Sequence, residues 1–275
     1  MYFEMSEPDY INFSSLIYRK AGINLHEGKK SLLKARLMKY LRKTRFRSID
    51  EYYQYLINDD TGEEMVHLLD VISTNLTYFF REPKHYDFLR DQALSQVMAF
   101  CNSLNKPAMR VWSAGCSSGE EAYSLGIVLN EFLFSQKGLQ IRIFATDIST
   151  RMLRKASDGI YEQEKLEKIP NDLRSRYFQR GINKRSGYFR VKPQLRELIS
   201  FKRLNLMEPF PPGQTFQIIF CRNVMIYFDK PTQERIVGKF YDALEKGGFF
   251  FIGHSESLTN VRHNFHYIQP SVYRK

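Results

Sequence analysis

The chain has 275 residues, 43% of them hydrophobic, and its 41 lysines and arginines outnumber its 30 acids. This length suffices for one large core with a small satellite domain, so we expect two units. The N-terminus lacks the basic start and apolar run of a signal peptide, and no stretch approaches the roughly 18 apolar residues of a membrane span. The sequence predicts a soluble cytoplasmic protein without membrane insertion, and its net charge of +11 favours a polyanionic partner.

The three cysteines, Cys101, Cys116 and Cys221, lie far apart in the sequence. They show no CxxC spacing and have no histidine-rich tract beside them, so neither a disulfide framework nor a zinc site is indicated. We therefore expect a reducing compartment and no metal.

Helical patterns dominate the first 70 residues or so. Apolar residues recur at helical spacing in four segments, which are 9–21, 27–45, 50–56 and 63–72. We expect residues 1–72 to form a small all-α domain.

The second of these segments belongs to a basic run, with nine lysines and arginines and no acid between Lys29 and Arg47. A solvated helix surface and a docking face both fit this composition. The missing acids would normally supply i,i+4 ion pairs, and their absence favours docking. We expect Lys34, Lys39 and Arg42 to meet an acidic acceptor.

After a helical connector at 84–101, strands and helices alternate. Strand patterns occur at 110–113, 141–147, 198–202, 216–221, 248–252, 266–268 and 271–273, and helical ones at 120–134, 149–157 and 232–244. Such alternation predicts an α/β fold with a doubly wound, mostly parallel seven-stranded sheet. Within this second domain, residues 73–275 with a linker at 73–100, we expect a small antiparallel hairpin insert at about 175–195, built from Tyr177-Phe178 and 188–191.

Ligands of parallel sheets bind at the carboxyl ends of the strands. The residues expected there are 115–121, Asp147, Asn205-Leu206, Arg222-Asn223 and 253–256. They should line one cleft.

Three features of these ends indicate the ligand. Gly115 and Gly119 permit a tight turn beside it. Asp147 can accept the two hydroxyls of a ribose or cap the helix that begins near Ser149, and these roles compete. Glu120 and Glu121 suit the positive end of a helix but would repel a phosphate, whereas an amino group or a sulfonium would be attracted. This favours S-adenosylmethionine over a dinucleotide.

Several long motifs resemble those of the CheR family, the chemoreceptor glutamate methyltransferases. The motifs are STNLTYFFRE at 73–82, VWSAGCSSGEE at 111–121, FATD at 144–147, FCRNVMIYFD at 220–229 and GHSE at 253–256. With the basic helix and the hairpin insert, the resemblance covers nearly the whole chain. One departure is Ala122, where many relatives would have proline.

The resemblance implies a methyltransferase that esterifies glutamates in the cytoplasmic helical region of chemoreceptors and releases S-adenosylhomocysteine. It also implies a receptor tether peptide bound at the hairpin insert. The cofactor-binding residues that it implies are Asn75, Thr77, Arg81, Gly115, Glu121, Asp147, Asn205, Leu206, Arg222 and Asn223. Among them, Glu121 would meet the methionine amino group, Asp147 the ribose, and Asn205 and Leu206 the adenine. Arg81 and Tyr227 would act at the reacting centre.

Two other functions stay open. A nucleic-acid methyltransferase would suit the charge of +11, although Arg-Asn-Val-Met at 222–225 stands where a D/N-P-P-Y/F motif is usual, and Cys221 lacks the proline that precedes a nucleophilic cysteine. The second alternative is a non-catalytic module that binds the cofactor or the receptor.

The chemistry of a glutamate acceptor is simple. Its carboxyl group, with a pKa of about 4.3, is already ionised at neutral pH and needs no general base.

Overall fold

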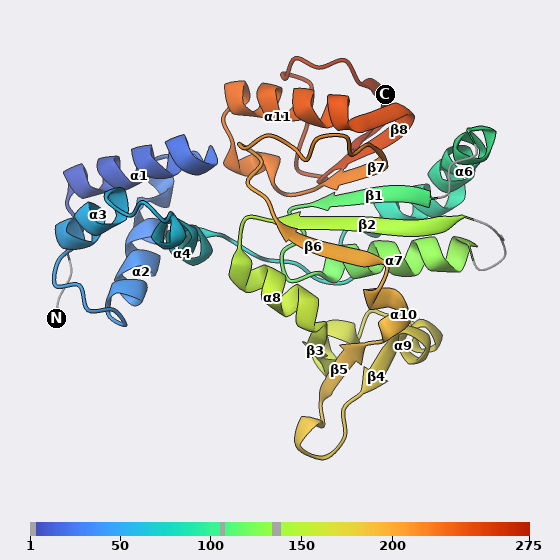
Figure 1. Cartoon of the computed structure of the whole chain (residues 1–275), viewed down its shortest axis with the longest axis horizontal. Coiled ribbons are helices and arrows are strands. Elements are labelled where there is room, and N and C mark those ends of the chain that lie inside the picture. Colours follow the sequence, from blue (N-terminus) through green and yellow to red (C-terminus); the bar gives the residue numbers. More distant parts are fainter. Residues whose placement is uncertain (1–3, 105–107, 134–138) are drawn as a thin grey trace.

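A computed structural model describes residues 4–104, 108–133 and 139–275. Figure 1 shows a helical unit beside one end of a central sheet, helices on both faces of that sheet, and a small second sheet below it. No helix among the described residues is both long enough and apolar enough to span a bilayer.

The helical unit has its own core. Its elements are α1 (Glu7–Ala21), η1 (Glu27–Lys29), α2 (Lys30–Leu41), α3 (Ile49–Ile57) and α4 (Glu63–Ile72). Ser6 and Asp9 form a capping box that starts α1, and the Ser48 side chain caps α3. Phe13, Leu37 and Tyr52 meet in the centre without solvent exposure. The four predicted helices are present.

Helix α2 is shorter than the predicted segment 27–45. It is preceded by a turn of 3-10 helix and ends at Leu41, whose carbonyl accepts a hydrogen bond from the Thr44 side chain. This local bond to the last turn competes with continuation of the helix.

The central sheet has seven strands in the order β6-β2-β1-β7-β8-β10-β9. Their bounds are β1 (Ala108–Ala114), β2 (Gln140–Asp147), β6 (Ile199–Arg203), β7 (Phe216–Cys221), β8 (Leu244–Ile252), β9 (His266–Gln269) and β10 (Val272–Arg274). β6, β2, β1, β7 and β8 are parallel, and β10 runs antiparallel to both of its neighbours. The predicted doubly wound, mostly parallel sheet is confirmed.

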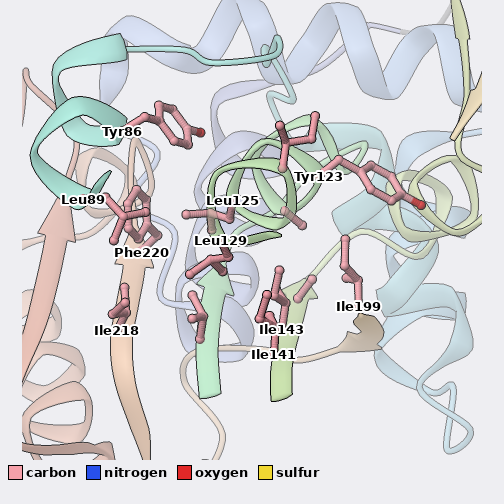
Figure 2. Close-up of a cluster of buried hydrophobic side chains, with 14 of the residues drawn as sticks. Tyr86, Leu89, Tyr123, Leu125, Leu129, Ile141, Ile143, Ile199, Ile218 and Phe220 are labelled. Carbon is pink, nitrogen blue, oxygen red and sulfur yellow. The ribbon is translucent and has the colours of Figure 1, made fainter. Parts of the chain in front are cut away.

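Helices cover both faces of this sheet (Figure 1). They are α5 (Pro83–Phe88), the π-helical η2 (Leu89–Ala93), α6 (Leu94–Ser103), α7 (Glu120–Leu133), α8 (Thr150–Asp158) and α11 (Lys230–Ala243). Every residue of β7 is buried, as expected for a strand covered on both faces. Figure 2 shows Leu125 and Leu129 of α7 packed with Ile141 and Ile143 of β2. The predicted end of α7 at Phe134 lies outside the described residues.

The insert is larger than the expected hairpin. It is a three-stranded antiparallel sheet in the order β3-β5-β4, formed by β3 (Ile160–Glu162), β4 (Phe178–Arg180) and β5 (Tyr188–Val191). Short helices surround it, namely η3 (Gln163–Leu166), α9 (Asn171–Tyr177), η4 (Asn183–Arg185) and α10 (Pro193–Arg196). The predicted antiparallel hairpin is present as β4 and β5, and β3 adds a third strand that is too short for an alternating pattern to show in the sequence.

Asp70 of α4 joins the helical unit to the sheet. Its carboxylate accepts hydrogen bonds from the Thr150 hydroxyl at 2.7 Å and from the Arg151 backbone N–H at 3.4 Å, at the start of α8. The side chain is buried, and a carboxylate at a helix N-terminus also interacts favourably with the helix dipole.

Replacing Asp70 by alanine should therefore lower the stability of the chain by about 1–3 kcal/mol, because two donors at the start of α8 lose their buried acceptor. Calorimetric unfolding of Asp70→Ala measures this as a lowered Tm. Asp60→Ala removes an exposed acid from a loop and is the matched control. Equal Tm values for the two variants would contradict this role of Asp70.

Candidate active site

The strand order places a cavity at the carboxyl ends of β1 and β7. The chain proceeds from β1 outward to β2 and β6, then returns to the other side of β1 to form β7, and such a reversal opens a crevice. A cavity of about 360 Å³ lies there. It is lined by all eleven residues predicted for the cofactor and the reacting centre, which are Asn75, Thr77, Arg81, Gly115, Glu121, Asp147, Asn205, Leu206, Arg222, Asn223 and Tyr227.

The loop after β1 is held tightly against its neighbours. The N–H groups of Gly115 and Cys116 both donate to the Thr146 carbonyl at the end of β2. Gly115 has φ +92°, and a Cβ there would lie 2.4 Å from a methyl group of Val224. Only glycine fits this position, so the loop can lie directly against the segment after β7.

Asp147 ends β2 and is nearly buried. Its two oxygens accept backbone N–H groups of Ser117 and Ser149, each at 2.8 Å. Helix α8 is capped by the side chain of Ser149, so Asp147 is not the N-cap. Burial raises the pKa of Asp147, and the N–H groups of Ser149 and Ser117 oppose that rise.

The two acids at the start of α7 have different surroundings. Glu120 is fully buried, and its carboxylate accepts from the Ser118 hydroxyl and pairs with Lys165 of the insert at 2.8 Å. Glu121 instead lines the cavity. It accepts from the Ser113 hydroxyl at 2.7 Å and from Arg222 at 3.1 Å, and burial raises its pKa although Arg222 and Ser113 oppose the shift.

Arg222 follows β7 and lies at the centre of a buried charge network. The residue is 4% exposed, and its guanidinium pairs with Glu82 at 2.9 Å and Glu121 at 3.1 Å and donates to the Arg81 carbonyl. Burial alone would raise the pKa of Glu82, but Arg222, Asn223 and the His254 N–H lower it overall. Glu82 thus joins the linker to the loops that follow β7 and β8. This role of Glu82 was not evident from the sequence, although Glu82 is the last residue of the motif 73–82.

Residues 253–256, expected to line the cleft, are not among the residues that line the cavity, and Glu256 instead shapes the adjacent loop. Its carboxylate accepts the backbone N–H groups of Gly253, Asn223 and Ile226. Asn223 has φ 58°, a left-handed conformation that these bonds hold in place. A Cβ on Gly253 would lie 2.6 Å from the Asn223 side-chain nitrogen, which explains glycine in the motif GHSE. The motif GHSE could be seen in the sequence. The hydrogen bonds from backbone N–H groups to its Glu256 could not.

The linker of residues 73–82 crosses the cavity and carries three of the predicted residues. Phe79 anchors it in the core against Tyr161 and Phe178 of the insert. The Asn75 carbonyl accepts from the Ser117 hydroxyl at 3.3 Å. Arg81 donates to the Leu76 carbonyl at 2.7 Å, which closes the linker into a loop at the cavity.

The helical unit supplies another wall. Asn205, expected at the adenine, donates to the Lys20 carbonyl at the end of α1 at 2.7 Å. The chain after α1 pairs with the end of the 3-10 helix η5 (Met225–Tyr227), because Asn24 N–H donates to the Tyr227 carbonyl and Ile23 bridges Phe228. The Tyr227 hydroxyl lies 3.4 Å from the Thr74 carbonyl, and the Lys29 ammonium lies 5.1 Å from the centre of its ring.

The three predicted docking residues lie outside the cavity and on different sides of α2. At about 100° per residue, Lys39 lies about 20° from Leu32, a cavity-lining residue of α2, whereas Lys34 lies about 160° away and Arg42 about 80° away. Lys34 is therefore on the side that carries the buried Leu37 and Leu41.

One group of possible metal ligands occurs among the described residues. Ligand atoms of Glu82, His85 and His254 lie within 4.8 Å of one another. The Glu82 oxygens already accept from Arg222, Asn223 and the His254 N–H. Burial lowers the pKa of His85 to about 3, so its imidazole is neutral and packs against Phe251.

The cavity suits a cationic ligand with hydroxyl and amino groups. Two carboxylates face it, that of the partly buried Glu121 and that of the buried Asp147, and burial raises the pKa of both, so that a nearby positive charge would stabilise their ionised forms. Its volume fits a ligand of nucleoside size. These properties match S-adenosylmethionine, whose sulfonium and amino groups are positive.

Asp147→Asn should weaken binding of S-adenosylmethionine about tenfold or more, because an amide nitrogen cannot accept the hydrogen bonds that the carboxylate oxygen does. Titration calorimetry measures this dissociation constant. Asp158→Asn, at the exposed end of α8, is the matched control. Affinities within twofold of each other would remove Asp147 from the cofactor site.

Comparisons with known proteins agree with this geometry. Residues 8–73 match the family described as CheR methyltransferase, all-alpha domain, and residues 75–274 match CheR methyltransferase, SAM binding domain. A chemotaxis protein methyltransferase of Borreliella burgdorferi is 39% identical over 262 residues, 94% of this chain and 91% of that protein. Chemotaxis protein methyltransferase 2 of Pseudomonas aeruginosa is 39% identical over 98% of this chain and 94% of its own length, and the Escherichia coli chemotaxis protein methyltransferase is 35% identical over 98% and 91%. The chain therefore belongs to the CheR family of S-adenosylmethionine-dependent methyltransferases of chemotaxis.

Proposed function

We propose that the chain is a protein-glutamate O-methyltransferase that esterifies glutamates in the cytoplasmic helical region of chemoreceptors. The observation that carries this proposal is that neither acid of the cavity lining, Glu121 or Asp147, is free to act as a general base. Glu121 accepts from Ser113 and Arg222, and Asp147 accepts two backbone N–H groups. Burial raises the pKa of Tyr227, so its hydroxyl stays protonated. Such a site suits an acceptor that is already ionised when it enters the cavity, because no base is then needed to remove a proton. A glutamate side chain meets this condition.

Each residue of the cavity would have a distinct role in methyl transfer. Bound S-adenosylmethionine supplies an electrophilic methyl group. Glu121 and Asp147 would hold the positive and hydroxyl-bearing parts of that cofactor, and Asn205 and Leu206 would contact its adenine. Asn75, Thr77, Gly115, Arg222 and Asn223 complete its surroundings. Arg81 would attract the acceptor carboxylate, and Tyr227 would orient it by a hydrogen bond or by packing. Positioning of this kind can lower a barrier by several kcal/mol, on the order of 7–11 at best.

The linkage of the product tests this function. Labelled methyl transferred from S-adenosylmethionine to the purified cytoplasmic fragment of a chemoreceptor from the same organism should be released as methanol by mild alkali. Carboxyl methyl esters hydrolyse under these conditions, whereas N-methyl and C-methyl groups do not. Base-stable label, or label in added nucleic acid, would favour a nucleic-acid methyltransferase. Cofactor binding without any transfer would indicate a non-catalytic module.

We also propose that α2 guides the acidic acceptor, with Lys39 as the principal contact. Lys39 is exposed and lies on the same side of α2 as the cavity-lining Leu32. Lys34 and Arg42, which were predicted from the sequence as docking residues together with Lys39, lie at other angles around the helix axis. Cations near the cavity would attract an acidic protein surface and speed its encounter.

Lys39→Glu should therefore raise the KM for the receptor fragment several-fold at low ionic strength, with a smaller effect at high salt. Lys34→Glu makes the same charge change on the other side of the helix and should have the smaller effect. Steady-state methyl transfer at two salt concentrations measures both. Equal KM increases for the two variants would contradict a directed docking face.

A receptor tether peptide, if the acceptor carries one, would pair with an edge of the insert. The hairpin at which the resemblance implies this peptide contains β5, but β5 lies between β3 and β4, so both of its sides are already paired. We propose instead that the peptide adds as a strand beside β3 or β4, whose outer edges are unpaired in this sheet.

A further inference from the structure

The loop that follows β6 carries Asn205 and Leu206, the two residues proposed to contact adenine. We refer to residues 204–210 as the adenine loop, which contains neither helix nor strand. Its backbone folds into a turn, in which the Glu208 N–H donates to the Asn205 carbonyl at 2.9 Å. An irregular loop has few backbone hydrogen bonds of its own, so its position beside the cavity depends on groups from other elements.

Lys239 of α11 holds the adenine loop from outside the cavity, which it does not line. Its ammonium donates to the Leu206 carbonyl and, at 2.9 Å, to the Glu208 carbonyl. It also lies 4.5 Å from the centre of the Phe210 ring. One side chain thus contacts three residues of the loop. Hydrogen bonds from a charged donor are roughly twice as strong as those between neutral groups, so these contacts restrain the loop effectively.

The surroundings of Lys239 support this restraint. Its side chain is partly buried, and burial lowers its pKa to about 8, so the ammonium is still mostly charged at neutral pH. Phe210 packs edge-on against Trp112 of β1 at 4.7 Å and against Phe240 of α11 at 5.1 Å. The end of the adenine loop is thereby fixed in the core, and Lys239 fixes the part between this anchor and β6.

The backbone that Lys239 holds belongs to a residue of the cavity wall. Leu206 is nearly buried and lines the cavity, while its carbonyl accepts from Lys239. The preceding residue, Asn205, is held from another direction, by the Lys20 carbonyl of α1. A displacement of about 1 Å is enough to weaken contacts to a bound ligand strongly. The two residues proposed at the adenine are therefore positioned by two separate helices.

We propose that Lys239 is a positioning residue for the cofactor, which holds the backbone at Leu206 and Glu208 in the conformation that recognises adenine. This inference rests on the proposed adenine contacts of Asn205 and Leu206. Because Lys239 lies outside the cavity, its loss should weaken binding of the adenosyl group and leave binding of the acceptor protein unchanged.

The test uses the full chain with Lys239→Met, which removes the ammonium but keeps a flexible side chain. Titration calorimetry should give a dissociation constant for S-adenosylhomocysteine about five- to tenfold higher than that of the wild type, because two charge-assisted hydrogen bonds are lost. Lys239→Arg should restore the affinity to within about twofold, because a guanidinium can also donate to two carbonyls. Lys230→Met removes an exposed lysine from the first turn of the same helix, and this matched control should bind like the wild type.

A second ligand separates positioning from a general loss of stability. S-inosylhomocysteine carries hypoxanthine in place of adenine, so the two ligands differ in the hydrogen-bonding groups on one edge of the base. A site whose polar groups are correctly placed discriminates between such ligands. The ratio of their two dissociation constants should fall about threefold or more in Lys239→Met and stay at the wild-type value in Lys239→Arg. A purely structural role of Lys239 would lower the Tm and leave this ratio unchanged.

Wild-type affinity or a wild-type ratio in Lys239→Met would overturn the proposal. Asn205→Ala identifies the reason. Weak binding in Asn205→Ala alone would remove Lys239 and leave the adenine contacts in place, whereas wild-type binding in both variants would reject the adenine contacts as well. Failure of the proposed function would look different, because the wild-type enzyme would then form no base-labile methyl group on the receptor fragment, while these binding measurements need no acceptor.

Discussion

The buried ion-pair network around Arg222 is the interaction on which the site depends. A buried guanidinium would be strongly unfavourable alone, and here its charge is balanced by Glu82 and Glu121. These two acids belong to the linker and to the start of α7, so the network fixes the linker above the strand ends. The loops after β7 and β8 join it through Asn223 and the His254 N–H. The cavity therefore has defined walls before any ligand enters.

The charge inside the cavity contrasts with the charge of the whole chain. The protein carries +11 overall, yet the cavity floor presents the carboxylates of Glu121 and Asp147. A basic exterior attracts acidic partners over a distance set by ionic strength, while buried acids act over short range and favour a positive ligand. Under the proposed function, the two ligands of one reaction, a cationic methyl donor and an anionic acceptor, would thus be attracted by different parts of the molecule.

Much of this arrangement could be predicted from the sequence. The seven strands of the main sheet followed from apolar runs such as Phe216–Cys221, and the eleven predicted site residues line one cavity because parallel strands bring their ends together. Three features could not be predicted. Strand β3 has three residues, too few for an alternating pattern. Glu82 accepts from Arg222, 140 positions away, and Glu256 accepts from Asn223, 33 positions away, and periodicity does not reveal such contacts. The directions of Lys34 and Lys39 depend on which side of α2 faces the core.

The contact between Asn205 and the Lys20 carbonyl has a consequence for how this protein can change over time. A residue of the sheet domain completes its hydrogen bonds on the last turn of α1, and the segment after α1 pairs with the backbone around Tyr227. Each unit has a core of its own, so each could tolerate substitution in its interior independently. The cavity wall, in contrast, is built from both units, so a substitution there in one unit must match the other. A chimera that joins the helical unit of one relative to the sheet of another would keep two intact cores but would have mismatched contacts between the two units. Recombination between relatives should therefore preserve the two units as a pair.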